Sequence, residues 1–195
     1  MAKVMVMNHV TLDGVMQAPG RPDEDTREGF EHGGWAIAGN DEVMRRKMGE
    51  GGMAKGGALL LGRRTYEDFY GYWPHQTDNP FTEALDRVPK YVASRTLGEP
   101  LPWSNSILLD GDAVDAVAEL KQKPIGDLTI MGSGDLISSL MASDLIDKFL
   151  LMIHPLVLGT GRRLFAGRLH ASLRLTDSVG TSTGVVIATY ERAGE

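Results

Sequence analysis

Short apolar runs recur along the chain, and most of them are continuous rather than alternating between apolar and polar positions. Such runs are typical of strands that are buried on both faces of a helix-covered sheet. They predict six strands, over Val4–Val10, Ala58–Leu61, Lys90–Ala93, Ser106–Leu109, Leu128–Met131 and Phe149–His154. Two later runs, Leu173–Asp177 and Val185–Glu191, flank a glycine-containing turn and predict an antiparallel hairpin.

Segments with helical spacing separate these runs. They predict helices over Asp41–Met48, Ala113–Gln122 and Gly134–Met141, the second of them with Asp112 as its N-cap. Strands that alternate with helices and end in a hairpin predict a three-layer α/β/α fold with a mostly parallel mixed sheet. Because the sequence shows neither a repeat nor a long linker, we expect residues 1–195 to form a single domain.

Composition narrows the class of protein. A formal net charge of −6 argues against general binding to nucleic acid or to an acidic membrane surface, and no run is long enough to cross a bilayer. The absence of cysteine excludes disulfides and thiolate metal sites and fits a reducing compartment, so we expect a cytoplasmic protein. None of the five histidines has metal-ligand spacing with another, so we expect no metal site. His154, which precedes a proline in a strand pattern, is interpreted as structural.

Two predicted strands end in glycine and lead directly into a helix. The first junction is Leu59-Leu60-Leu61-Gly62-Arg63-Arg64-Thr65-Tyr66, in which Thr65 is a candidate helix cap. The second is Thr129-Ile130-Met131-Gly132-Ser133-Gly134-Asp135-Leu136. The N–H groups at such helix starts favour anions, and arginine adds charge-assisted hydrogen bonds. An ordinary strand–turn–helix is the alternative for each junction, but two in one small domain favour a dinucleotide site.

Two other segments bear on such a site. A third strand ends in Ser94-Arg95, where the arginine is either a surface charge or a partner for the 2′-phosphate that distinguishes NADPH from NADH. The polar loop Gln17–Gly34 is either an active-site cover or a plain surface excursion.

These segments resemble known reductases. Gly62–Tyr66, Ser94-Arg95 and Gly132–Gly134 resemble, in this order, the three NADPH-binding segments of dihydrofolate reductase. Val10–Gly14 and His154–Phe165 are more similar to the C-terminal reductase domain of riboflavin biosynthesis, the RibD C-terminal domain. The resemblance covers nearly the whole chain. It implies a dihydrofolate reductase-like fold, NADPH as cofactor and a homodimer.

The resemblance also implies roles for individual residues. Gly62 to Thr65 would hold the cofactor phosphates, Ser94 and Arg95 the 2′-phosphate, and Gly132 to Gly134 the pyrophosphate, with a cis peptide between Gly132 and Ser133. His9 and Met16 match positions beside the nicotinamide. The full set of implied cofactor residues is His9, Met16, Gly62, Arg63, Arg64, Thr65, Ser94, Arg95, Met131, Gly132, Ser133, Gly134, Asp135 and Leu136.

The substrate side carries fewer signals. Dihydrofolate reductase holds its substrate with a carboxylate on the first helix, and Asp41 is the nearest candidate here, with support of the helix N-terminus as the alternative. Asp13 is a candidate proton donor, with a turn role or an ordered water as the alternatives. Candidates for an aromatic substrate wall, or equally for the core, are Trp35, Tyr66, Tyr72 and Trp73.

We therefore expect NADPH-dependent reduction of a C=N or C=O bond in a small heterocyclic substrate, because the cofactor carries the chemistry and the protein supplies position. The resemblance suggests an enzyme similar to 5-amino-6-(5-phosphoribosylamino)uracil reductase of riboflavin biosynthesis. The alternatives are a non-catalytic dimeric nucleotide-binding module of the same fold and a true dihydrofolate reductase.

Overall fold

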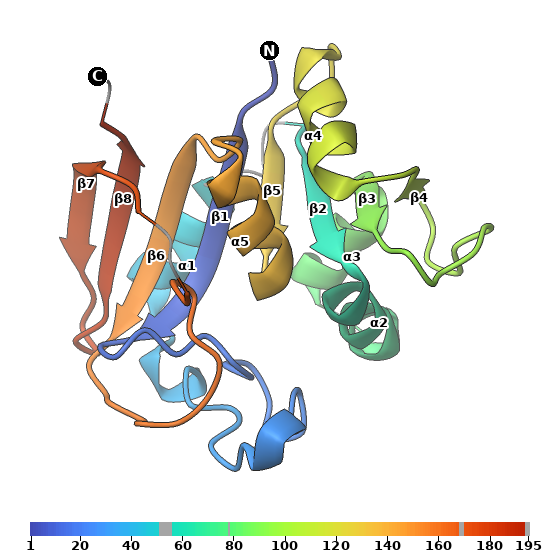
Figure 1. Cartoon of the computed structure of the whole chain (residues 1–195). Helices are drawn as coiled ribbons and strands as arrows, with labels where there is room; N and C mark the ends of the chain where they lie inside the picture. Colours follow the sequence, from blue (N-terminus) through green and yellow to red (C-terminus); the bar gives the residue numbers. More distant parts are fainter. Residues whose placement is uncertain (51–55, 78, 168–169, 194–195) are drawn as a thin grey trace.

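The computed structural model describes residues 1–50, 56–77, 79–167 and 170–193 and contains one eight-stranded sheet (Figure 1). The strand order is β4-β3-β2-β5-β1-β6-β8-β7. The strands are β1 (Val4–Thr11), β2 (Ala58–Gly62), β3 (Lys90–Ala93), β4 (Ser106–Leu109), β5 (Leu128–Met131), β6 (Lys148–His154), β7 (Leu173–Gly180) and β8 (Val186–Arg192).

Strands β1 to β6 are mutually parallel, and β8 and β7 add an antiparallel edge. The predicted fold class, a mostly parallel mixed sheet with a C-terminal hairpin, is confirmed. Parallel strands point their carboxyl ends toward one edge of the sheet, so the segments that follow β1, β2, β3 and β5 meet there.

Helices cover both faces of the sheet (Figure 1). They are α1 (Glu42–Glu50), α2 (Arg63–Tyr72), α3 (Pro80–Arg87), α4 (Ala113–Gln122) and α5 (Gly134–Ala142). On one face Val6 and Val10 of β1 pack in a cluster with α4 and α5. On the other face Met5 and Met7 pack with Met44 of α1, as the alternation of side chains along a strand requires. Within the described ranges, no helix has both the length and the apolar character that crossing a membrane demands.

Most predicted elements are present. β3, β4, β5 and α4 have the predicted bounds, and Asp112 caps α4 by accepting a hydrogen bond from Val114 N (2.9 Å). Helix α3 was not predicted. The interpretation of Thr65 as a helix cap is wrong, because α2 already begins at Arg63, with Gly62 as an N-cap residue that makes no side-chain cap.

Candidate functional site

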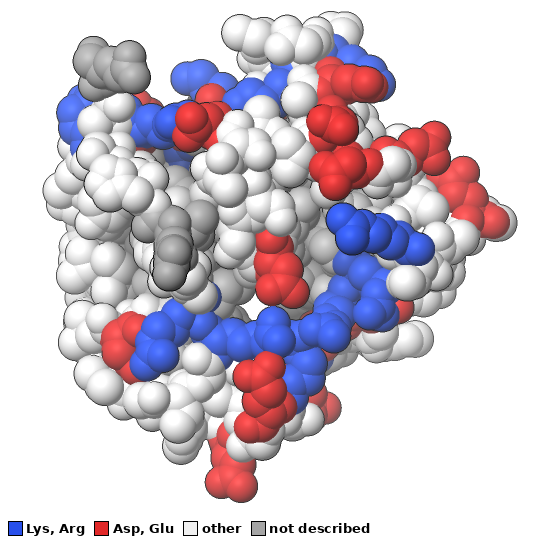
Figure 2. Space-filling model, viewed as in Figure 1, with Lys and Arg blue, Asp and Glu red and all other residues white. Residues whose placement is uncertain are grey.

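A cleft of about 1480 Å³ opens at the carboxyl ends of the parallel strands, between the starts of α2 and α5. Figure 2 shows a hollow on this face that is crossed by a band of Lys and Arg side chains, with acidic side chains beside it. The basic residues that line the cleft are Arg21, Arg27, Arg45, Arg63, Arg64, Arg95, Arg162 and Arg163. A chain that is acidic overall therefore places eight arginines along this cleft, beside several acidic residues, and such a band of arginines suits an anionic ligand.

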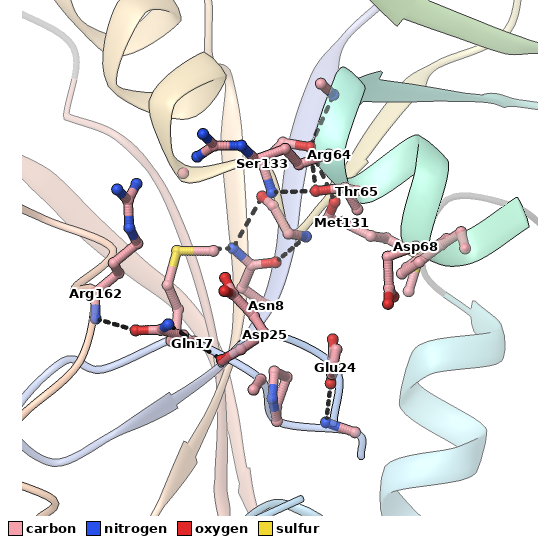
Figure 3. A pocket seen from close by; sticks show the side chains of 18 of the residues that line it. Asn8, Gln17, Glu24, Asp25, Arg64, Thr65, Asp68, Met131, Ser133 and Arg162 are labelled. Carbon is pink, nitrogen blue, oxygen red and sulfur yellow. Dashed lines mark hydrogen bonds between the residues drawn. The ribbon is translucent and has the colours of Figure 1, made fainter. Parts of the chain in front are cut away.

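The two strand–glycine–helix junctions are joined to each other in the cleft (Figure 3). The Ser133 backbone N–H and hydroxyl both donate to Thr65 Oγ1, each at 3.0 Å. Gly62 N donates in turn to Ser133 Oγ at 2.9 Å. Asn8 of β1 accepts from Gly132 N at 2.7 Å. These bonds fix the starts of α2 and α5 side by side.

Neither of these two helix starts has a side-chain cap. The neighbouring helices differ, because Asn79 caps α3 and Asp112 caps α4. The first N–H groups of a helix have no intrahelical partner, and the helix dipole makes them favourable for negative charge. The two uncapped starts therefore present backbone donors to the cleft.

The expected cis peptide between Gly132 and Ser133 is wrong. The bond is trans, and the cis bond found in the described residues is Glu99–Pro100. Instead, the turn into α5 is made by two successive residues with positive φ, +62° at Gly132 and +59° at Ser133. A non-glycine residue in this conformation costs about 1–2 kcal/mol, so the bonds to Thr65 and Gly62 hold a strained turn in place.

Three arginines mark the outer part of this region. Arg63 forms an ion pair with Glu67 (2.9 Å), and the exposed Arg64 has no hydrogen-bond or ion-pair partner among the described residues. Arg95, at the end of β3, lies 3.7 Å from Asp112 with 87% of its side chain exposed. These guanidinium groups keep most of their donors available to a ligand.

The structure brings every predicted cofactor residue to the lining of this cleft. They are His9, Met16, Gly62, Arg63, Arg64, Thr65, Ser94, Arg95, Met131, Gly132, Ser133, Gly134, Asp135 and Leu136. Their shared location is what a dinucleotide site requires, and their binding role stays a prediction.

The loop that follows β1 forms one wall of the cleft through residues 17–21 and 23–28. Arg21 donates to both oxygens of Asp68 on α2 (2.5 and 3.5 Å) and lies 4.2 Å from the centre of the Tyr72 ring. Glu24 accepts two backbone hydrogen bonds within the loop (2.6 and 3.1 Å), and burial raises its pKa. The loop thus lines the cleft, as an active-site cover would, and is called the cover loop. None of these charged residues was predicted as part of the site.

Arg162 connects this cover to the segment after β6 and to α5. Its backbone N–H donates to Gln17 Oε1 at 3.0 Å (Figure 3). Its guanidinium bonds Glu28 at 2.8 Å and lies 3.6 Å from Asp135. Three segments that are far apart in the sequence are therefore held together at the edge of the cleft.

Two histidines meet beneath the cleft. His9 lines it, and His9 Nδ1 lies 2.8 Å from Nε2 of the buried His154 on β6. Burial lowers the pKa of His9 to about 3 and that of His154 to about 4, so both rings are neutral at pH 7. Among the described residues no group of three or more His, Cys, Asp or Glu is placed to hold a metal ion.

Asp13 does not line the cleft, and its carboxylate is already occupied. It accepts hydrogen bonds from Thr11 Oγ1 (2.6 Å), Leu158 N (3.2 Å) and Gly159 N (2.9 Å). Arg163 Nη2 lies 3.4 Å from Asp13 Oδ2, the oxygen that also accepts from Gly159 N. The Thr11 hydroxyl, together with the backbone donors, lowers the pKa of Asp13 to about 2. This geometry supports the turn role over the proton-donor role.

We expect Asp13→Asn to destabilise the protein at neutral pH, because the amide cannot accept all of these bonds. The pKa of Asp13 is lowered from 3.8 to about 2, so its contribution is present above about pH 4 and is lost as pH falls toward 2. The difference in urea midpoint between variant and wild type should therefore shrink over that range, and Asp110→Asn, at an exposed position, should show no difference. Unchanged stability with abolished turnover would restore the proton-donor role.

The three predicted substrate residues also lie outside the cleft lining. Tyr66 is 1% exposed, and its hydroxyl accepts from Trp103 N, so it is a core residue. Asp41 accepts hydrogen bonds from Met44 N in the first turn of α1 and from Ser182, in agreement with helix support. Trp35 Nε1 donates a hydrogen bond to Gln17 O and so helps to hold the cover loop in place. Of the aromatic candidates, Tyr72 and Trp73 do line the cleft.

The comparison with protein families agrees with this geometry. The model of the RibD C-terminal domain matches residues 2–187. The chain belongs to this family. A curated relative with a similar sequence is the "Uncharacterized protein YyaP" of Bacillus subtilis (strain 168). It is 31% identical to this RibD C-terminal domain over 142 residues, which are 70% of this chain and 74% of the relative.

Solved structures similar to this RibD C-terminal domain share its fold. The "Putative riboflavin biosynthesis protein" of Shewanella sp. PV-4 has a TM-score of 0.70 and 23% identity, with both chains covered completely. A pyrimidine reductase-like protein of Corynebacterium diphtheriae has a TM-score of 0.65 and 12% identity, over all of this chain and 93% of the other. At these identities the likeness shows the fold alone.

Proposed function

We propose that this RibD C-terminal domain is an NADPH-dependent reductase of a small heterocyclic substrate. The observation that carries the proposal is the pair of uncapped helix starts, α2 and α5, joined through Thr65 and Ser133. Two sets of free backbone donors at one cleft suit the two phosphates of a dinucleotide. The family, and the names of its structural neighbours, support a reductase.

The residues present fit such a cofactor. At Gly132 a Cβ would lie 3.0 Å from Thr65 Cγ2, so the turn is open only to a residue without a side chain, and its backbone stays accessible to a phosphate. Arg64 and Arg95 lie in the cleft lining with free donors for the phosphate oxygens. The cleft volume exceeds the roughly 300–1,000 Å³ of a site for one small ligand.

When bound, NADPH supplies a hydride from its nicotinamide ring. This chain then has to hold two reactants against each other and exclude water. Met16 and Met131 provide apolar surface beside Asn8, while the cover loop closes one wall through its Arg21–Asp68 ion pair. The cover is fixed at its other end by Arg162.

Dihydrofolate reduction is a weaker candidate. Asp41, the carboxylate nearest to the expected position on the first helix, is bound to Ser182 and to its own helix. Asp68 and Asp25 do line the cleft, but each forms an ion pair with an arginine. We therefore propose a substrate of the aminopyrimidine type over dihydrofolate.

The proposal is tested by titrating the purified protein with NADPH and NADH and following tryptophan fluorescence, which Trp73 in the cleft should report. We expect saturable quenching with a Kd at least about tenfold lower for NADPH, since an arginine–phosphate pair contributes about 1.5–3 kcal/mol. Binding of neither nucleotide would contradict the proposal. NADPH binding without its oxidation by either the phosphoribosylamino-pyrimidine or dihydrofolate would favour the non-catalytic module, and turnover of dihydrofolate alone would identify a dihydrofolate reductase.

A further inference from the structure

The part of the cleft on the α1 face of the sheet has an apolar wall. The residues that form it are Met7, Met48, Phe69, Trp73, Phe81, Met131 and Met152. They belong to the two core clusters under α1 and under α2 and α3, and Met131 packs against both. Its aromatic rings pack edge-to-face on one another, and aromatic and methionine side chains of this kind suit a flat, uncharged ring.

Within the wall, the buried Trp73 Nε1 has no hydrogen-bond partner among the described residues. The other polar side chains that line this part, apart from His9, are exposed or already bonded. Asn40 and Arg45 are exposed, and Arg45 bonds Glu42. Asp68 is held by Arg21, and Asn79 caps α3. His9 is different, because it follows Met7 on the same face of β1 and one of its ring nitrogens has no partner among the described residues.

The surroundings of His154 determine which nitrogen of His9 carries the proton. The Nδ1 edge of His154 packs closely on Gly39, where an added Cβ would lie 2.7 Å from His154 Nδ1 and 2.5 Å from His154 Cε1. The rings of Trp35 and His154 pack edge-to-face, with their centroids 5.2 Å apart. No acceptor for an Nδ1–H of His154 occurs among the described residues. A buried N–H without an acceptor costs about 1–3 kcal/mol, so the proton of the neutral His154 ring lies on Nε2.

His154 Nε2–H then donates to His9 Nδ1 across the 2.8 Å contact. His9, also neutral because burial lowers its pKa to about 3, has its proton on Nε2. With Nδ1 engaged, Nε2 is the ring nitrogen left for a ligand. A protonated imidazole nitrogen can only donate, so it accepts a ligand oxygen or bare ring nitrogen and disfavours an amino group.

We propose that His9 is a specificity-determining residue, which donates from Nε2 to an acceptor atom on a flat, uncharged heterocycle, and that His154 is the positioning residue that fixes this tautomer. The substrate class is a flat ring that packs on the apolar wall and presents a carbonyl or imine acceptor to His9 Nε2, and a ring that presents an amino group to this nitrogen is rejected. This inference rests on the proposed reductase function, but it concerns only the part of the site that would bind the substrate.

The test uses two probes with the same ring and opposite hydrogen-bonding edges, pteridine-2,4-dione and pteridine-2,4-diamine. In ¹⁵N-labelled protein at pH 7, long-range ¹H–¹⁵N spectra should show His9 and His154 both as neutral Nε2–H tautomers. The dione should change the chemical shifts of the His9 ring nitrogens. It should also bind about tenfold more tightly than the diamine, because the dione gains a hydrogen bond from His9 Nε2–H while the diamine places a second donor against it. A His9 ring protonated on Nδ1, or tighter binding of the diamine, would overturn the inference.

Variants separate positioning from packing. His9→Phe and His154→Phe keep a ring in place, and both should reduce the preference for the dione to about onefold. The spectrum of His154→Phe should also show His9 no longer fixed as the Nε2–H tautomer. His75→Phe, at an exposed position outside the cleft, is the matched control and should keep the preference. Retained preference in His154→Phe would refute the positioning role. Because these readouts need no NADPH, failure of nucleotide binding would count against the proposed function and not against this inference.

Discussion

Replacing Arg95 with alanine is expected to weaken NADPH binding by about ten- to a hundredfold and to leave NADH binding nearly unchanged. The Arg95 side chain is 87% exposed, and its contact with Asp112 at 3.7 Å is an exposed ion pair, which contributes little. Its donors are therefore available to the 2′-phosphate, where charge-assisted hydrogen bonds contribute about 1.5–3 kcal/mol. The measurement is the fluorescence titration with each nucleotide.

The control for this experiment is Arg87→Ala, which removes an exposed arginine at the end of α3, outside the cleft lining. It should alter neither affinity. Equal weakening of NADPH and NADH by Arg95→Ala would mean that Arg95 acts on the common part of the two nucleotides. An unchanged NADPH affinity would remove it from the site.

Gly132→Ala should both destabilise the protein and reduce NADPH binding at least about tenfold. The backbone φ of +62° at Gly132 costs an alanine about 1–2 kcal/mol. The added Cβ would also lie 3.0 Å from Thr65 Cγ2 and 3.1 Å from Thr65 Oγ1. Thr65 must then shift, which weakens its hydrogen bonds with Ser133 and with them the link between α2 and α5. We expect a fall of about 2–4 kcal/mol in the free energy of unfolding, measured with urea.

Gly98→Ala is the matched control, because a Cβ there meets nothing within 4 Å and the residue lies outside the cleft. It should leave both stability and binding unchanged. If Gly132→Ala lowered stability while NADPH affinity was unaffected, the linked helix starts would be a structural device with no part in cofactor binding.

The inner strands could be predicted from sequence because their burial appears directly as apolar runs. β5 is the clearest case, with Leu128, Thr129 and Ile130 each fully buried and its predicted bounds identical to the observed ones. β7 is exposed over most of its length. Its apolar signal therefore stops early, and the prediction ended at Asp177 while the strand continues to Gly180.

Helix α3 was missed although the sequence contains a start signal for it. Asn79 followed by Pro80 is a typical N-cap and first helical position, and Asn79 does accept a hydrogen bond from Phe81 N. The helix is short, with eight residues, but it buries Thr82 and Leu85 on one side, so an amphipathic pattern was present in the sequence as well.

In the site, too, residues that belong to a local sequence pattern could be predicted, and contacts between distant segments could not. The glycines and arginines after β2, β3 and β5 were predictable, because a strand end followed by a helix start is a local pattern. The Arg21–Asp68 ion pair and the His9–His154 contact join residues that are far apart in sequence, so they depend on the strand order and on the path of the cover loop. The hydrogen bonds that favour a turn role for Asp13 could not be predicted for the same reason, because its partner Gly159 lies 146 residues away.

The central place of β1 has a consequence for how this protein is made. In the described sheet β1 lies between β5 and β6, so Val4 has no partner until Leu128 is synthesised and Val6 has none until Phe149 is synthesised. Pairing between such distant segments is slow, and the waiting strand exposes its apolar face and both of its edges. During translation the N-terminal strand therefore stays open until the ribosome has released residue 154, and we expect this interval, rather than the finished fold, to determine how much of the chain aggregates when it is produced quickly.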